Sequence, residues 1–151
     1  MKKLDENFVA DQVKQLIEKL GLSATAEVSR LDKTFIIDIA SADSSLLIGK
    51  YGANLESLQF ILAVRIKIQT NEDDFEVVLD VDGWRKDREE KLQSQAATIA
   101  QEVAATGQAQ TLEDLQAWQR RVIHLALADH PQVATESEGE GQDRRLVIKP
   151  R

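Results

Sequence analysis

The sequence has no cysteine, only two prolines and few aromatic residues among its 151 positions. Without cysteine there can be no disulfide, thiolate metal site or cysteine nucleophile. The two histidines, His124 and His130, lack the HExxH spacing of a zinc site and have no third ligand pattern. No apolar run is long enough to span a bilayer, and the acids in residues 1–13 leave no signal-peptide core. We therefore expect a cytoplasmic protein without membrane insertion, metal or cofactor.

The charge is acidic and unevenly distributed, with a formal net value of -7. Residues 1–82 carry 9 basic and 15 acidic side chains, and residues 83–151 carry 10 and 11. Affinity for nucleic acid comes mainly from Lys and Arg that neutralise phosphates, so the total charge opposes it. Local clusters matter more, and basic residues gather near Arg120 and the carboxyl terminus. Any nucleic-acid binding is expected to be weak or selective.

The first part of the chain predicts a small α+β domain. Apolar residues at helical spacing indicate helices, alternating β-prone residues indicate strands, and Gly21 is a helix cap. The predicted order is α-β-β-α-α-β. Its elements are helix 4–20, strands 24–30 and 34–40, a short helical turn and a longer helix within 44–68, and strand 75–82.

The remaining residues predict a second α+β domain, with helices packed on a small β-sheet. Helix formers dominate up to a stop at Gly107, and the pair His130-Pro131 breaks a later helix. No flexible linker separates the two domains near Asp82-Gly83. The predicted elements are helix 83–106, a short extended piece 109–112, helix 115–128, and strands 132–138 and 144–150.

A GxxG loop, Gly49-Lys50-Tyr51-Gly52, precedes the longer helix of the first domain. Glycines let a sugar-phosphate chain approach the backbone, N–H groups of the following helix favour anions, and Lys50 adds a positive charge. GxxG alone often marks only a turn. Together with the apolar Leu46–Ile48 before it and the α-β-β-α-α-β order, however, it resembles a type II KH domain over residues 1–82.

A KH domain clamps the backbone of about four nucleotides and leaves their bases to an apolar groove. The resemblance implies backbone contacts from Gly49, Lys50 and Gly52, with Ile48 and Tyr51 shaping the path of the bases. Tyr51 departs from the pattern, because a second basic residue is common at this position. Core packing is the competing interpretation for residues 46–48, and we expect it for at least two of them.

A second motif, Arg120-Arg121-Val122-Ile123-His124, places Arg120 and His124 four residues apart and so on one helical face. A guanidinium can hold a phosphate or stack on a base, and a histidine one turn away can do the same. The alternative is an interior histidine beside surface arginines. Trp118 could stack a base, but we expect it to pack, as we do for Trp84 at the domain junction.

The segments around this motif, WQRRVIHLAL and SEGEGQDRRLVIKP, closely resemble the R-3-H domain that ends the Jag (SpoIIIJ-associated) proteins. In that family a KH domain directly precedes the R-3-H domain, here expected over residues 83–151, and LDVDGWRKDREEKL looks like the junction. Many Jag proteins carry an additional amino-terminal domain, which we expect to be missing here. Further basic residues could line a phosphate track with the RxxxH motif, although solvation is the competing interpretation for each of them: Arg144, Arg145, Lys149 and Arg151.

The predicted function is binding of single-stranded RNA by the GxxG loop and the RxxxH helix. The resemblance implies a bacterial post-transcriptional regulator linked to cell envelope growth or division, with a small single-KH-domain protein as partner and single-stranded DNA as an alternative ligand of the R-3-H domain. An enzyme is not expected, since GKYG is no P-loop and Asp80 and Asp82 are unaccompanied strand-end acids. The main alternative is a protein-interaction adaptor without strong nucleic-acid binding.

Overall fold

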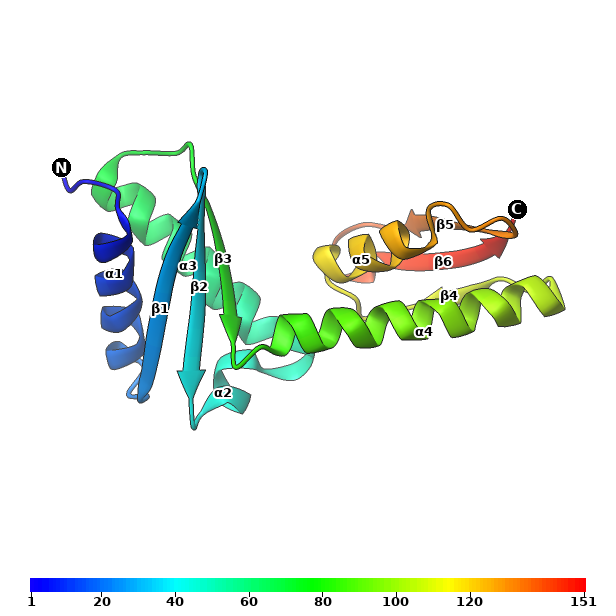
Figure 1. The fold of residues 1–151 in the computed structure, drawn as a ribbon, viewed down its shortest axis with the longest axis horizontal. Helices are drawn as coiled ribbons and strands as arrows, with labels where there is room; N and C mark the ends of the chain where they lie inside the picture. The colour runs from blue at the N-terminus through cyan, green and yellow to red at the C-terminus, as the bar shows by residue number, and fades with distance from the viewer. The chain divides into compact units, whose positions relative to one another are not determined.

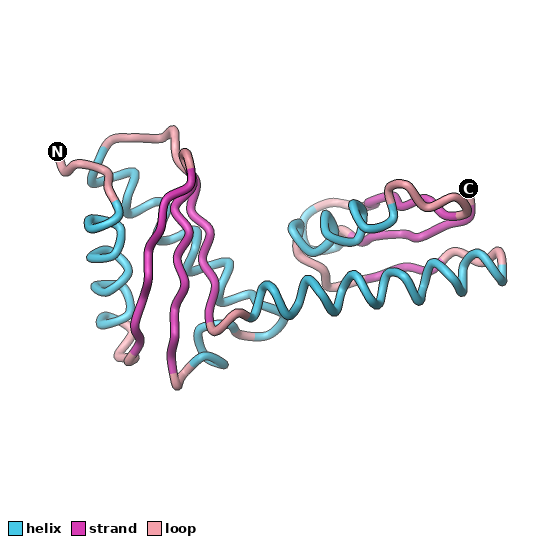
Figure 2. Tube along the Cα trace, in the orientation of Figure 1, coloured by secondary structure: helices cyan, strands magenta, loops and turns pink.

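A computed structural model describes residues 1–151 and shows a mixed α+β protein (Figure 1). The chain divides into two compact units, residues 1–85 and 86–151, which we describe separately. Each unit holds one three-stranded sheet, and Figure 2 distinguishes its strands from its helices. None of the helices combines the length and the apolar character needed to cross a bilayer.

Unit 1 contains a sheet with strand order β1-β2-β3, in which β1 and β2 are antiparallel and β2 and β3 are parallel. Figure 1 shows α3 running behind these strands. The elements are α1 Glu6–Lys19, β1 Ala24–Leu31, β2 Thr34–Ser41, α2 Ser44–Ile48, the 3-10 turn η1 Lys50–Gly52, α3 Ala53–Thr70 and β3 Glu76–Val81.

Local sequence signals fix where these elements begin and end. The Asp5 carboxylate accepts a hydrogen bond of 2.9 Å from the Phe8 backbone N–H and so caps α1. The helix ends before Gly21, whose φ of 71° is left-handed, and Asp32 turns β1 into β2 with a φ of 59°. Each boundary thus follows from a residue suited to its backbone conformation.

The two faces of the unit 1 sheet differ sharply in character. Alternate residues of β2 and β3, among them Ile37 and Leu79, are buried with apolar residues of α1 and α3 in one core. On the opposite face, Glu27 is in register with Asp38, and Asp38 with Asp80. Side chains directly opposite each other in a sheet share a face, so this open face carries a row of three carboxylates.

Unit 2 contains an antiparallel sheet with strand order β4-β6-β5. Its core joins one side of α4, including Leu92 and Val103, to Ile123 of α5 and to Leu146 and Ile148 of β6. The elements are α4 Trp84–Thr106, which begins in unit 1, β4 Gln110–Leu112, α5 Ala117–Leu127, β5 Val133–Glu138, the 3-10 turn η2 Gly141–Asp143 and β6 Arg145–Pro150.

Helix α5 begins at Ala117, two residues later than the sequence predicted. Gln116 occupies the N-cap position, and its backbone N–H donates to the Gln119 side chain at 3.0 Å in a capping box. Glutamine is an uncommon cap, so the sequence pattern did not mark this boundary.

Candidate nucleic-acid interface

The GxxG loop connects α2 to α3 and has an unusual backbone. Gly49, Tyr51 and Gly52 have φ values of 72°, 55° and 79°, so three of its four residues lie in the left-handed region. Glycine adopts this conformation at little cost, whereas for Tyr51 it is uncommon. The loop therefore needs neighbours that hold it in place.

Both loop glycines are required by contacts within unit 1. A Cβ on Gly49 would lie 2.5 Å from Cγ of Asn54, and a Cβ on Gly52 would lie 2.5 Å from Cη2 of Trp84. The Asn54 amide also donates to the Leu46 carbonyl at 2.8 Å, which ties α3 back to α2. Asn54 was not among the residues predicted from the sequence, although an asparagine just after a glycine turn often bonds through its side chain to a nearby backbone group.

The side chains around the loop fall into a packed set and an exposed set. Leu47 is buried and Ile48 packs partly against the core, which confirms that two of residues 46–48 are core residues. Leu46 is 61% exposed and Tyr51 is 51% exposed. Lys50 is exposed, and its Nζ lies 5.2 Å from the centre of the Tyr51 ring. A cation and an aromatic ring thus lie together at the surface, and an exposed aliphatic side chain lies on α2, which precedes the loop.

The RxxxH motif lies on α5, and its three polar residues differ in their surroundings. Arg120 is half-buried, and its Nη1 donates to the Leu115 carbonyl at 2.5 Å. His124 is exposed, with Nδ1 2.6 Å from Oγ1 of Thr135 on β5. Arg121 is exposed and makes no hydrogen bond or ion pair, so its guanidinium is available to a phosphate.

The basic residues of β6 lie on the other face of the sheet from α5. Leu146 and Ile148 point into the core with α5, so Arg145 and Lys149, which alternate with them, point away. Lys149 forms an ion pair with Glu136. That hydrogen bond and the opposite charge lower the pKa of Glu136 and raise the pKa of Lys149.

Arg144 and Arg145 are also surrounded by acids. Arg145 pairs with Glu138 at 3.7 Å, and the Arg144 Nη1 donates to the Gly139 carbonyl at 3.3 Å. The two arginines line a hollow of about 300 Å³ together with Glu113, Asp114 and Asp143. The structure therefore does not bring Arg145 and Lys149 to the face of Arg120 and His124, and it balances Arg144 and Arg145 with carboxylates.

Both tryptophans are half-buried. Trp118 donates from Nε1 to Gln116 at 3.1 Å beside the α5 cap, and Trp84 packs against the unit 1 core. Packing was the predicted role for each, and the contact of Trp84 with the unit 1 core confirms it for that residue.

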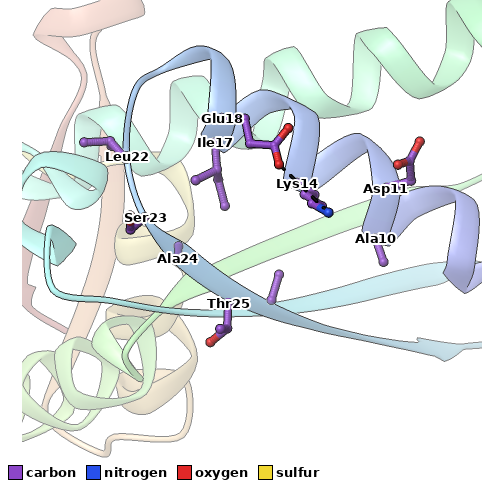
Figure 3. A pocket seen from close by; sticks show the side chains of 10 residues that line it. Ala10, Asp11, Lys14, Ile17, Glu18, Leu22, Ser23, Ala24 and Thr25 are labelled. Carbon is purple, nitrogen blue, oxygen red and sulfur yellow. Dashed lines mark ion pairs between the residues drawn. The ribbon is translucent and has the colours of Figure 1, made fainter.

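A hollow of about 590 Å³ lies between α1 and β1, away from every predicted site residue (Figure 3). Small side chains such as Ala10 and Ala24 line it, and its charged residues include Lys14 and Glu18, which pair with each other at 3.9 Å. No group of three metal-ligating side chains converges in the protein. The candidate interface is therefore an exposed surface rather than a pocket.

Comparisons with known proteins bear on both halves of the chain. The family model of the R-3-H domain matches residues 90–150. A protein from Clostridium symbiosum named RNA-binding protein KhpB is 31% identical over 129 residues, which cover 85% of this chain and 58% of that protein. Its namesake from Lactiplantibacillus plantarum is 31% identical over 140 residues, 93% of this chain and 43% of that protein.

The Bacillus subtilis protein of the same name is 29% identical over 135 residues, which cover 88% of this chain and 64% of that protein. The chain thus spans between 43% and 64% of the length of these three curated relatives. The R-3-H domain expected from the sequence is confirmed: residues 90–150 match the R-3-H domain family, and the chain is homologous to the RNA-binding protein KhpB.

Proposed function

We propose that the chain binds single-stranded RNA through two surfaces. The first is the GxxG loop of a type II KH domain, residues 1–82. The second is the exposed face of α5 in an R-3-H domain, residues 83–151. The homologues' name, the R-3-H match and the order of elements in unit 1 support this assignment.

The observation that carries the proposal is the geometry at the start of α3. Gly52 is the N-cap residue of α3 and provides no side-chain acceptor, so the first N–H groups of this helix lack a side-chain cap. Such groups bind anions well, particularly where glycines let a phosphate come close. Lys50 adds charge, while Tyr51 and Leu46 present surfaces for a base. A backbone clamp with a neighbouring stacking surface fits single-stranded nucleic acid.

On α5, Arg121 supplies the available cation, with Arg120 and His124 one turn apart beside it. We leave Arg144, Arg145 and Lys149 outside this surface, because Arg145 and Lys149 point from the opposite face of the sheet and a phosphate would have to compete with the present carboxylate or carbonyl partners of all three. Single-stranded DNA is the alternative ligand here. No catalytic step is assigned to any residue.

The biological role that we propose is post-transcriptional regulation linked to cell envelope growth or division. It rests on the resemblance to Jag proteins and on homology to KhpB. Since the chain spans only part of those relatives, this role is assigned to their shared segment.

Fluorescence anisotropy with a mixed-sequence single-stranded RNA tests the RNA-binding proposal. Lys50→Asp and Arg121→Ala should each weaken binding several-fold. Lys33→Asp is the matched control, because Lys33 is an exposed lysine of unit 1 that pairs with Asp74 at 2.5 Å. No binding by the wild type at low salt, or equal loss in the Lys33 control, would contradict the proposal.

A protein-interaction role is the second candidate, and one surface favours it. Helix α3 is apolar on its exposed side as well as its buried side, with Phe60 70% and Ile68 75% exposed and Ile61 and Val64 between them. Contiguous exposed apolar patches often mark sites of protein association. The partner that we propose is a small single-KH-domain protein. Phe60→Asp should abolish co-elution with such a protein and leave RNA binding unchanged.

A further inference from the structure

The GxxG loop is in direct contact with the first residue of α4. The position that a Cβ of Gly52 would take lies 2.5 Å from Cη2 and 2.7 Å from Cζ3 of Trp84. The indole ring therefore fills the space beside Gly52, and the half-buried ring also packs against the core of unit 1. Gly52 itself is buried, so the absence of a side chain at this position makes room for the Trp84 ring, and the ring in turn supports the loop.

The next residue of α4 holds this contact in place. The Arg85 side chain is only 15% exposed, and its Nη2 donates to the Glu56 carboxylate at 2.9 Å and to the Gln59 side chain at 3.0 Å. Its Nε donates to the Leu79 carbonyl at 2.7 Å. Glu56 lies in the first turn of α3, directly after the loop, so Arg85 connects the start of α4 to the start of α3.

The backbone of Arg85 is held as well. Its N–H donates at 2.9 Å to Asp80, at the end of β3. With both its side chain and its backbone bonded inside unit 1, Arg85 leaves the preceding residue, Trp84, little freedom to move away from Gly52. A charge-assisted network of this kind is costly to break, because it would strand a largely buried guanidinium.

The loop has reason to depend on such support. Glycine has the widest conformational freedom of any residue, and Tyr51 holds a backbone conformation uncommon for its type. A loop free to leave this shape would have to be ordered each time RNA binds, which would weaken binding. Contact with a fixed ring removes that cost before RNA arrives.

We propose that Trp84 and Arg85 are positioning residues for RNA binding: they hold the GxxG loop in its binding conformation without themselves touching RNA. This inference rests on the proposed RNA-binding function. It makes the first turn of α4, and not the loop sequence alone, a determinant of affinity.

The first experiment compares the RNA affinity of Trp84→Ala and Trp84→Phe with wild type in the full chain. Trp84→Ala should weaken binding about tenfold, the effect of losing about 1.4 kcal/mol of preorganisation. Trp84→Phe keeps a ring beside Gly52 and should recover part of the affinity. Trp118→Phe is the control, because Trp118 lies in unit 2 at the α5 cap.

Combined variants separate a positioning role from general destabilisation. With the loop disabled by Lys50→Asp, Trp84→Ala should have little further effect. With the α5 surface weakened by Arg121→Ala, Trp84→Ala should still weaken RNA binding about tenfold. If Trp84→Ala reduced RNA affinity equally in both backgrounds, Trp84 would not act through the loop.

A spectroscopic readout keeps the proposal testable if Trp84→Ala does not fold. The chain has two tryptophans, so Trp118→Phe leaves Trp84 as the sole one. Binding of RNA should then change the fluorescence emission of Trp84. Glu56→Gln weakens the ion pair that anchors Arg85, so it should reduce both this emission change and the RNA affinity. Wild-type binding that is sensitive to Lys50 but indifferent to Trp84 and Glu56 would overturn this inference alone. Absence of wild-type binding would overturn the proposed function and this inference with it.

Discussion

The basic side chains proposed to meet RNA differ in whether a carboxylate already neutralises them. Lys50 and Arg121 form no ion pair, whereas Lys149 and Arg145 pair with Glu136 and Glu138. A phosphate that takes a paired cation must displace its carboxylate, so the net gain is small. Affinity should therefore depend mainly on the unpaired cations.

Gly52→Ala tests how much of the loop geometry depends on Trp84. Alanine at this left-handed position would be strained and would also meet the Trp84 ring, so unit 1 should lose about 2–4 kcal/mol of stability. Gly21→Ala is the matched control: its φ of 71° is similar, but nothing lies within 4 Å of the added Cβ. Urea unfolding of both variants gives the comparison, and equal losses would argue against a Trp84 contact.

The Lys149–Glu136 pair should make stability depend on pH in a defined direction. The pKa of Glu136 is lowered from its ordinary value of 4.5, so its contribution is present above that value and lost as the pH falls through the folded pKa. The pKa of Lys149 is raised from 10.5, so its contribution is lost only as the pH rises through a still higher value.

Glu136→Gln should therefore lower the thermal midpoint slightly at neutral pH, and the difference from wild type should close as the pH falls below 4.5 and through the lowered pKa of Glu136. Glu140→Gln, an exposed acid of the same hairpin without an ion pair, should match wild type throughout. A gap between wild type and Glu136→Gln that persists in acid would show that the effect is not electrostatic.

The elements themselves could largely be predicted, because each carries a local signal. The alternation of β3 and the glycine after α4 placed those elements within one or two residues. The Gly52–Trp84 contact could not be found this way, since it joins residues far apart in sequence and leaves no periodic trace. The ion pair between Lys149 and Glu136 could not be predicted either. It depends on the register of the β5–β6 hairpin, in which Lys149 lies opposite Ala134, two residues from Glu136.

Helix α3 shows a further limit of sequence patterns. Its apolar residues surround the helix, so the pattern predicts a helix but does not say which side is buried. The structure buries Leu55, Leu62 and Ile66 and exposes Phe60 and Ile68. Excess apolar surface on one helix is what a partner-binding element would need.

Two substitutions on α3 should therefore differ widely in their effect on stability. Leu62→Ala removes a fully buried side chain and should cost about 2–5 kcal/mol. Phe60→Ser, on the exposed side, should change stability by less than about 0.5 kcal/mol. Chemical denaturation of the protein without a partner checks both, and a large loss for Phe60→Ser would mean that this side of α3 is covered.

At the scale of the whole molecule, charge decides how RNA can approach. The net charge is -7, and the open face of the unit 1 sheet carries the row Glu27, Asp38 and Asp80. Phosphates are repelled from that face. An acidic protein can still bind RNA where cations are gathered, but the number of phosphate contacts must be small.

The salt dependence of RNA affinity measures that number directly. For single strands, the logarithm of the binding constant falls with the logarithm of salt concentration by about 0.7 per phosphate neutralised. Contacts from Lys50, Arg120 and Arg121 alone predict a slope of about -2, whereas full participation of Arg144, Arg145 and Lys149 would give about -4. We expect the shallower slope, because carboxylates or a carbonyl already bind Arg144, Arg145 and Lys149.

Two substitutions test this expectation. Lys50→Ala should reduce the slope by about 0.7, while Lys149→Ala should leave it unchanged. Anisotropy titrations across a range of KCl concentrations distinguish the two cases, and a slope near -4 would show that RNA opens the β5–β6 ion pairs and wraps both faces of the unit 2 sheet.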